Sequence, residues 1–479
     1  MHRTIVFFVL VGTVLATTLG GGAPVSAGLC QNPPMPKITD QSVKQAPSMA
    51  QPAARTPYAD QVFGTCVVRV TDHEKDIASN DSSKGLKNEY SRVQSFNADE
   101  SRILVRGTSG SWYLYDANTL QPLGQASFKG TDPRWDATDP ALLYSSDGTR
   151  LTSYNVQTKE QKVVHDFMAD FPGKKLQAVW TRYEGSPSID SRYWGLMAED
   201  ENWNTVALLV YDKQADRVIA TRETPPSDVD SVSISPRGDY FLAAFMNECN
   251  QTADAAHPCG AMVYDQSLKT GRSLGTHVGH GDFAFDTQGR EVVVFQDSGT
   301  DYISMVDLAT GNVTQLTPID FSHTAISLHF SGRAFGKPGW ALVSTTDDNA
   351  TSFTWMDDQV FALELAPNGR VVRLAHDHTL VDKEQEHDYW AEPHGSVNRN
   401  FTKVLFTSNW GRSGTEGVDM YMVALPANAI TSKIGPIDTA SAVSGASATG
   451  IPGFEGALAV VALAAGTSIS LAVKHIKRR

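Results

Sequence analysis

The sequence predicts an all-β protein, a seven-bladed β-propeller whose ring is closed by an N-terminal strand, followed by a C-terminal transmembrane or sorting helix. Between residues 61 and 426, short apolar strand patterns alternate with turn residues, and no amphipathic helix of useful length interrupts them. These patterns recur in units of roughly 40 to 50 residues, which is the period of propeller blades. Seven polar clusters mark the beginnings of seven such units.

Each unit begins with a polar cluster, continues through a turn of Asn, Asp, Ser or Gly, and reaches an apolar strand. The clusters are Glu89–Arg92, Asp132–Trp135, Val179–Arg182, Val232–Ile234, His280–Phe283, a cluster near His323, and Glu392–Ser396. The unit from 323 to 391 is unusually long, so eight blades are the alternative.

The last unit supplies only three strands, of which Met420–Val423 is the third. Cys66–Val70 has the apolar pattern of the missing outer strand. An N-terminal strand that pairs with the last blade removes the exposed edges of both segments. We therefore expect residues 61–426 to form one closed ring, preceded by residues 28–60 as a linker rich in Pro, Gln and Ala.

The first 27 residues have the pattern of a secretory signal peptide. A basic start at His2 and Arg3 precedes the apolar run Ile5–Leu19, and Val25-Ser26-Ala27 is an acceptable cleavage site. We therefore expect the protein to be exported. The alternative, an N-terminal membrane anchor, is disfavoured by the short apolar run and by the small residues after it.

The other end has a three-part pattern. After a Ser/Ala/Thr-rich linker (427–450), residues 451–479 contain Pro452-Gly453-Phe454, the apolar stretch Gly456–Val473 and a basic end. An apolar stretch of this length can just span a bilayer. The pattern resembles the Pro-Gly-Phe type of sorting signal of archaeal surface proteins, which implies cleavage and attachment to a membrane lipid. A plain transmembrane helix is the alternative, and both place the body outside the cell, anchored at its surface.

The chain has four cysteines, none in a CxxC pair. In an oxidising environment, Cys30 with Cys66 and Cys249 with Cys259 are the disulfides that keep the loops short. The alternative for the second pair is a zinc site formed with His257 and His277.

The formal net charge of -13 argues against nucleic acid as a partner, because no basic stripe occurs before the C-terminal tip. Several Asn-X-Ser/Thr triplets permit glycosylation of an exported protein. They begin at Asn80, Asn250, Asn312, Asn349 and Asn400.

In a propeller the innermost strand of each blade begins at one rim of the central channel, so the polar clusters are expected to converge there. Arg92, Arg134 and Arg182 occupy matching positions of their units, and with Asp282 they are the candidate ligand-binding residues. Guanidinium groups bind carboxylates or sulfates with two hydrogen bonds, which predicts an anionic ligand such as an acidic sugar. The alternative is that each arginine fastens two blades by pairing with Glu89, Asp132 or Asp136.

Histidines and carboxylates meet in two of the clusters. His280 precedes Gly281-Asp282, and His394 follows Glu392-Pro393. His280, Glu392 and His394 are the candidate ligands of a divalent metal, and His280, His394 and Tyr90 are the candidate catalytic residues. The alternative is that they are buried polar residues that satisfy backbone groups in the channel.

These clusters resemble those of secreted propellers related to the oligogalacturonate lyases and, more distantly, the ulvan lyases. The likeness covers roughly residues 85–425 and rests on short motifs. It implies a manganese ion (calcium being the other candidate cation) held at the channel mouth by histidines and a glutamine. His280 and His394 match such positions and Glu392 stands near another, whereas the His-X-His pair of that family has no counterpart.

Two functions follow. The preferred one is a surface-anchored binding module that takes a glycan or an envelope protein at the channel rim. The alternative is a polysaccharide lyase that neutralises a uronate carboxylate with arginine or a metal and removes the C5 proton. A hydrolase is disfavoured because the chain has no Gly-X-Ser-X-Gly motif.

Overall fold

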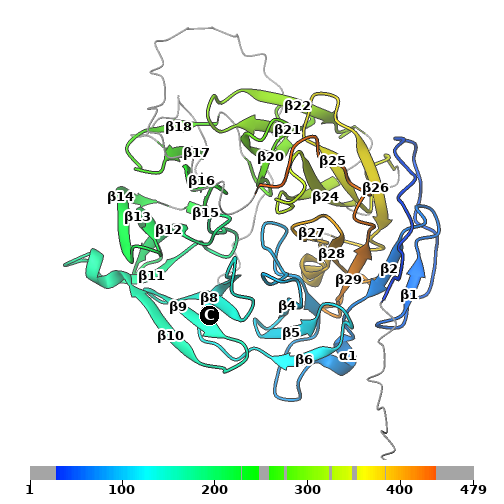
Figure 1. Cartoon of the computed structure of the whole chain (residues 1–479), viewed down its shortest axis with the longest axis horizontal. Coiled ribbons are helices and arrows are strands. Elements are labelled where there is room, and N and C mark those ends of the chain that lie inside the picture. The colour runs from blue at the N-terminus through cyan, green and yellow to red at the C-terminus, as the bar shows by residue number, and fades with distance from the viewer. Residues whose placement is uncertain are drawn as a thin grey trace, which may run out of the picture. The chain divides into compact units, whose positions relative to one another are not determined.

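The computed structural model describes residues 29–227, 229–246, 258–274, 278–322, 326–347, 353–382 and 384–437. Over these residues the chain forms seven antiparallel sheets that surround a central channel (Figure 1). The prediction of an all-β, seven-bladed propeller is confirmed. The alternative of eight blades is wrong, because the long unit from 323 to 391 forms a single four-stranded blade followed by a short helix.

The blades follow one another along the chain, each from its inner to its outer strand. Blade 1 contains β3 (Leu86–Lys87), β4 (Arg102–Gly107), β5 (Trp112–Asp116) and β6 (Pro122–Gln125). Blade 2 contains β7 (Thr131–Trp135), β8 (Leu142–Asp147), β9 (Arg150–Asn155) and β10 (Gln161–Asp166). Blade 3 contains β11 (Leu176–Trp180), β12 (Tyr193–Asp200), β13 (Thr205–Asp212) and β14 (Arg217–Ser227). Blade 4 contains β15 (Val229–Ile234), β16 (Tyr240–Phe245), β17 (Gly260–Asp265) and β18 (Gly271–Ser273).

The remaining blades complete the ring. Blade 5 contains β19 (Asp282–Phe285), β20 (Glu291–Asp297), β21 (Tyr302–Asp307) and β22 (Val313–Pro318). Blade 6 contains β23 (Ile326–Ser331), β24 (Trp340–Asp347), β25 (Gln359–Glu364) and β26 (Val371–His376). Blade 7 contains β27 (Ser396–Val397), β28 (Lys403–Ser408), β29 (Asp419–Ala424), β2 (Cys66–Arg69) and β1 (Pro57–Ala59). Three short helices are α1 (His73–Asp76), η1 (Phe167–Asp170) and η2 (Glu386–Ala391).

The core is divided among the seven interfaces between consecutive blades, each of which holds one apolar cluster. β13 shows how the sequence produces this arrangement. Leu209 and Tyr211 pack against blade 2, whereas Leu208 and Val210 pack against blade 4. Because side chains alternate between the two faces of a strand and both faces are buried, the strand is apolar throughout.

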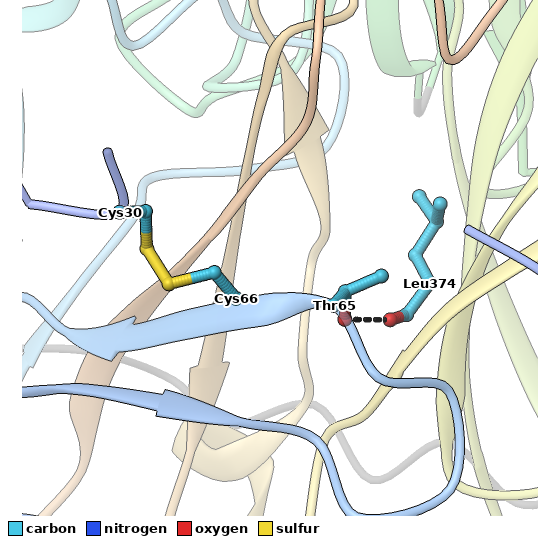
Figure 2. The surroundings of a disulfide bond; sticks show 4 residues. All are labelled: Cys30, Thr65, Cys66 and Leu374. Carbon is cyan, nitrogen blue, oxygen red and sulfur yellow. Dashed lines mark hydrogen bonds between the residues drawn. A yellow bond between two sulfur atoms is a disulfide. The ribbon is translucent and has the colours of Figure 1, made fainter. Parts of the chain in front are cut away.

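The N-terminal strand closes the ring. β2 pairs with β29 from Cys66 opposite Ala424 to Arg69 opposite Tyr421, and so supplies the outer strand of blade 7. β1 then adds a fifth strand that the sequence analysis did not foresee. Figure 2 shows two links beside β2: a disulfide joins Cys30 to Cys66, and the Thr65 hydroxyl donates to the backbone oxygen of Leu374 in blade 6.

Residues 29–60, which we expected to form a linker, lie along the outer edges of blades 6 and 7. The backbone oxygen of Ile38 accepts from the Arg373 amide at 3.0 Å, and that of Met49 accepts from Trp410 Nε1 at 3.1 Å. Gln51 donates to the Tyr421 hydroxyl at 2.8 Å. These hydrogen bonds tie the segment to the propeller.

The chain after blade 7 crosses beneath blade 6. Trp340 Nε1 donates to the backbone oxygen of Thr431 at 3.1 Å, and Lys433 pairs with Glu364 at 3.0 Å. The Ile437 amide donates to the backbone oxygen of Phe335 at 2.9 Å. The predicted signal peptide (1–27) and sorting segment (451–479) lie outside the described residues, and within the described ranges no helix is long and apolar enough to cross a membrane.

Candidate metal centre in the channel

Because every blade repeats the same strand order, the inner strands all begin at one end of the channel, here called the upper rim, and end at the lower rim. His280 and His394 lie just before the inner strands β19 and β27, at the upper rim. Both have a left-handed backbone, with φ of 58° and 43°. Such strain in residues other than glycine is uncommon and concentrates at functional sites. Beside His280, residue 281 must be glycine, since a Cβ there would lie 2.7 Å from the Val294 oxygen.

Three histidines from three consecutive blades meet at this rim. His280 Nδ1 (blade 5) lies 2.7 Å from Nε2 of His329, which belongs to β23 in blade 6. The rings of His329 and His394 (blade 7) are perpendicular, with centroids 4.3 Å apart. Glu392 Oε2 lies 3.2 Å from His394 Nε2 and 3.5 Å from His329 Nε2. The cluster therefore combines three imidazoles with one carboxylate.

The donor atoms of His329, Glu392 and His394 lie within 4.8 Å of one another, close enough for one ion to bind all three. Imidazole nitrogen and carboxylate oxygen together suit divalent first-row metals such as manganese, iron and zinc. His280, which the sequence analysis named as a ligand, has its Nδ1 2.7 Å from His329 Nε2 but lies outside this three-residue donor set. The donor set thus fits the divalent metal expected from the sequence, with His329 as an additional ligand.

Burial controls the charge of these groups. His329 and His394 are each 1% exposed, and burial lowers the pKa of both well below the ordinary value for histidine. Burial also lowers the pKa of His280 and raises that of Glu392. The imidazoles are therefore neutral at physiological pH, which is the form that binds metals.

Lys87, at the end of β3, contacts the histidine cluster through His394. Its Nζ lies 2.8 Å from His394 Nδ1, and burial, assisted by the charge of Arg106, lowers its pKa to about 7. Asn88 donates to the His394 backbone oxygen and so fixes the position of this residue.

Tyr90 and Arg92 lie on residues 88–94, which follow β3 and approach the histidines. The Tyr90 ring is 4.7 Å from the His394 ring and 5.4 Å from the His329 ring. Burial raises the Tyr90 pKa well above its ordinary value, so its phenol keeps its proton. The Arg92 guanidinium lies 5.5 Å from the Tyr90 ring centroid and pairs with Glu184 at 2.8 Å. Tyr90 therefore lies next to the proposed ligands, and Arg92 is beside it with a carboxylate partner of its own.

Two of the predicted ligand-binding residues are engaged in fastening blades. Arg134 is buried, pairs with Glu89 of blade 1 at 3.1 Å and donates to the backbone oxygens of Gly185 and Tyr183 in blade 3. Asp282 is buried and accepts two hydrogen bonds from Arg333 of blade 6. The hydrogen-bonding groups of both side chains have partners within the protein. Arg134 pairs with Glu89, one of the partners named in the blade-fastening alternative for the arginines.

Arg182, the third predicted arginine, donates to the backbone oxygen of Val229 at 2.5 Å. The second cysteine pair is described only in part: Cys259 is disulfide-bonded, whereas its predicted partner Cys249 lies outside the described residues. His257, His277 and His323 lie outside them as well.

Sequence reasoning missed three residues of this site. His329 lies in the middle of an inner strand, whereas the polar clusters mark only the beginnings of units. Its signal is a histidine between Leu328 and Phe330 in a short strand. Lys87 precedes the cluster Glu89–Arg92 by two residues. Arg106 is the second-last residue of β4, the second strand of blade 1, which contains no polar cluster of the kind that marks the units.

No protein-family model matches the chain, and no curated protein matches it. Among solved structures, the chain is similar to an oligogalacturonate lyase in complex with manganese, with a TM-score of 0.55 and 18% identity over 78% of this chain and 96% of that one. It is also similar to the oligogalacturonate lyase of Vibrio parahaemolyticus, with a TM-score of 0.52 and 14% identity over 77% and 96% of the two chains. At these identities the likeness establishes a shared propeller fold.

Proposed function

We propose that this protein is a metal-dependent polysaccharide lyase that cleaves uronate-containing oligosaccharides by β-elimination. The observation that carries the proposal is the meeting of His280, His329, Glu392 and His394 at one rim of the channel. The sequence favoured a binding module because the ligand set was incomplete. His329 supplies a further histidine, and we therefore prefer the lyase to the binding module.

His329, Glu392 and His394 would hold a divalent cation, with His280 beside them. When bound, such an ion supplies a positive charge that neutralises a uronate carboxylate and makes the C5 proton more acidic. We assign removal of that proton to His280, which is outside the three-residue donor set. Tyr90 is assigned the transfer of a proton to the departing O4 as the C4–O4 bond breaks and the C4–C5 double bond forms.

One structural argument supports the role of Tyr90, and the similar solved structures suggest the metal and the substrate to test. Tyr90 retains its proton and lies against the rings of both His329 and His394, as an acid beside the centre must. The solved lyases with the same fold are described as acting on oligogalacturonate, and one is a manganese complex. Manganese and oligogalacturonate are therefore the first metal and substrate to test.

The test measures metal content and turnover in the same preparation. Purified protein is expected to bind about one equivalent of manganese and to raise the ultraviolet absorbance of oligogalacturonate as unsaturated uronate forms. His394→Ala removes a metal ligand, so we expect at least a 100-fold loss of metal affinity, on the order of the largest losses seen on removing supporting groups, and loss of the absorbance signal.

His165→Ala is the matched control, because His165 lies on the outer strand of blade 2 and pairs with Asp170 and Asp216. This variant is expected to keep both metal and activity. Full metal binding by His394→Ala would refute the proposed centre. Metal binding without turnover on any polyuronate would return the assignment to a glycan-binding or envelope-protein-binding module.

We also propose that the protein acts outside the cell, anchored at the surface through residues 451–479. The support is the sequence of the two termini. Protease treatment of intact cells is the test: an anchored external propeller is digested and is released from membranes when the tail is deleted.

A further inference from the structure

We propose that Arg106 is the receptor for the acidic group of the saccharide, and that it determines specificity for an anionic over a neutral sugar. The inference rests on the proposed function, since it concerns the same site. It assigns a role to a residue outside the histidine cluster.

Arg106 differs from three other arginines near the channel, each of which forms an ion pair with a carboxylate. Arg92 pairs with Glu184, Arg134 with Glu89, and Arg333 with Asp282. In the described part of the chain Arg106 forms no ion pair, and its Nε is buried without a hydrogen-bond partner. A buried donor without an acceptor is costly, on the order of 1–3 kcal/mol. Such a donor is expected where a ligand supplies the acceptor.

Two aromatic side chains hold the guanidinium of Arg106. Its Cζ lies 5.6 Å from the ring centroid of Tyr183 and 6.0 Å from that of Trp390. Contacts of this kind position a cation without neutralising its charge. The planar fork of the guanidinium can therefore form two parallel hydrogen bonds with a carboxylate, while the rings offer apolar surfaces to the faces of a sugar.

The pairing of β3 with β4 places two cations side by side. Lys87 is directly opposite Arg106 in this antiparallel pair. Residues in such a pair lie on the same face of the sheet, and like charges there repel each other. Lys87 is buried and also lies 5.7 Å from the ring centroid of Trp390. An anion bound at Arg106 relieves this repulsion. This is the second observation that favours an anionic ligand.

The location connects Arg106 to the proposed metal centre. Lys87, its cross-strand neighbour, contacts His394 Nδ1 at 2.8 Å. A carboxylate bound to Arg106 would therefore be separated from the proposed metal ligands by the Lys87 side chain. The ligand class is a saccharide with a planar carboxylate; a sulfated sugar shares the anionic chemistry, and the experiment separates the two.

The test is calorimetric binding by the full-length protein, free of added metal, of three trisaccharides: galacturonate, neutral galactose and sulfated galactose. For Arg106→Gln we expect the Kd for trigalacturonate to rise at least tenfold, with that for the neutral trisaccharide unchanged. Arg106→Lys retains the charge but loses the fork, so it is expected to recover only part of the affinity for the carboxylate. Arg102→Gln, on the same strand and opposite Asp116, is the matched control and is expected to bind as wild type.

Because Arg106 forms no ion pair with a described residue and opposes Lys87, Arg106→Gln is expected to leave the melting temperature unchanged or raise it. A fall of several degrees, or unchanged binding of trigalacturonate, would overturn the proposal. Tighter binding of the sulfated sugar, lost in the same variant, would overturn the choice of carboxylate. Binding does not depend on turnover, so a protein with no lyase activity can still pass this test.

Discussion

At the scale of single residues, buried carboxylates at the inner strands connect one blade to the next. Asp282 at the start of β19 binds Arg333 and the Gly332 amide of blade 6. Asp132 in β7 accepts hydrogen bonds from the amides of Thr181 and Tyr183 in blade 3. In both cases a carboxylate at the channel satisfies donors that would otherwise be buried alone.

Asp282→Asn is expected to lower the free energy of unfolding by about 3 kcal/mol, because it leaves the Arg333 guanidinium buried without a counter-charge. Urea unfolding followed by fluorescence measures the change. Arg150→Gln breaks an exposed pair with Asp166 and is expected to cost less than about 1 kcal/mol. Equal effects of the two substitutions would contradict the fastening role of Asp282.

The residue scale also shows how far the sequence could predict the site. His280, Glu392 and His394 were found because they precede inner strands, whose beginnings share one rim. The same rule failed for Arg134, because position along a strand does not reveal whether a side chain faces the channel or a neighbouring blade. Arg106 could not be found at all, because its proposed role depends on pairing with Lys87 across two strands and on the rings of Tyr183 and Trp390, which are distant in sequence.

At the scale of elements, a histidine connects the outer parts of blades 2 and 3. His165 in β10 lies 2.8 Å from Asp170 of η1 and 2.8 Å from Asp216, between β13 and β14. Burial, the largest influence, lowers the His165 pKa, but the hydrogen bonds to both aspartates outweigh it and raise the pKa above the ordinary value for histidine. Protonated His165 can donate to both carboxylates at once.

This contact predicts a dependence of stability on pH. Since the folded pKa is raised, the contribution is fully present below the unfolded pKa of about 6.5 and is lost as the pH rises through the folded value. The difference in melting temperature between wild type and His165→Gln is expected to be largest near about pH 5.5 and to shrink towards about pH 9. A difference that grew with pH would contradict this account.

The strands themselves were largely predictable, because the interfaces between blades bury both faces of each sheet. The sequence of these strands is therefore clearly apolar. The exceptions are β1 and the segment before it. In that segment the backbone oxygens of Ile38 and Met49 accept hydrogen bonds from the propeller, and Gln51 donates one to it. A segment rich in Pro, Gln and Ala carries no periodic apolar pattern, so its attachment to the propeller is invisible in the sequence.

At the scale of the whole molecule, stability depends on closing the ring with β2. Without this strand, the backbone groups of β29 that face β2 lose their partners and form an open edge. Deleting residues 29–69 is therefore expected to cause association through β29 and a lower melting temperature, as measured by light scattering and calorimetry.

A shorter deletion, of residues 29–48 combined with Cys66→Ser, keeps both β1 and β2 and serves as the control. It is expected to remain monomeric, because the edge of β29 stays covered. A monomeric 29–69 deletion with the melting temperature of wild type would show that the ring does not depend on this strand.

The lower end of the channel has a kinetic consequence. Ile189, Phe285 and Phe335, from blades 3, 5 and 6, pack together there, and Ile437 lies against them. Above them, Arg92 and Glu184 meet between blades 1 and 3. Under the proposed function, we expect these side chains to keep saccharide chains at the upper rim, beside the histidine cluster. Newly made fragments would then leave from the same rim at which the next chain arrives, so we expect them to compete with it.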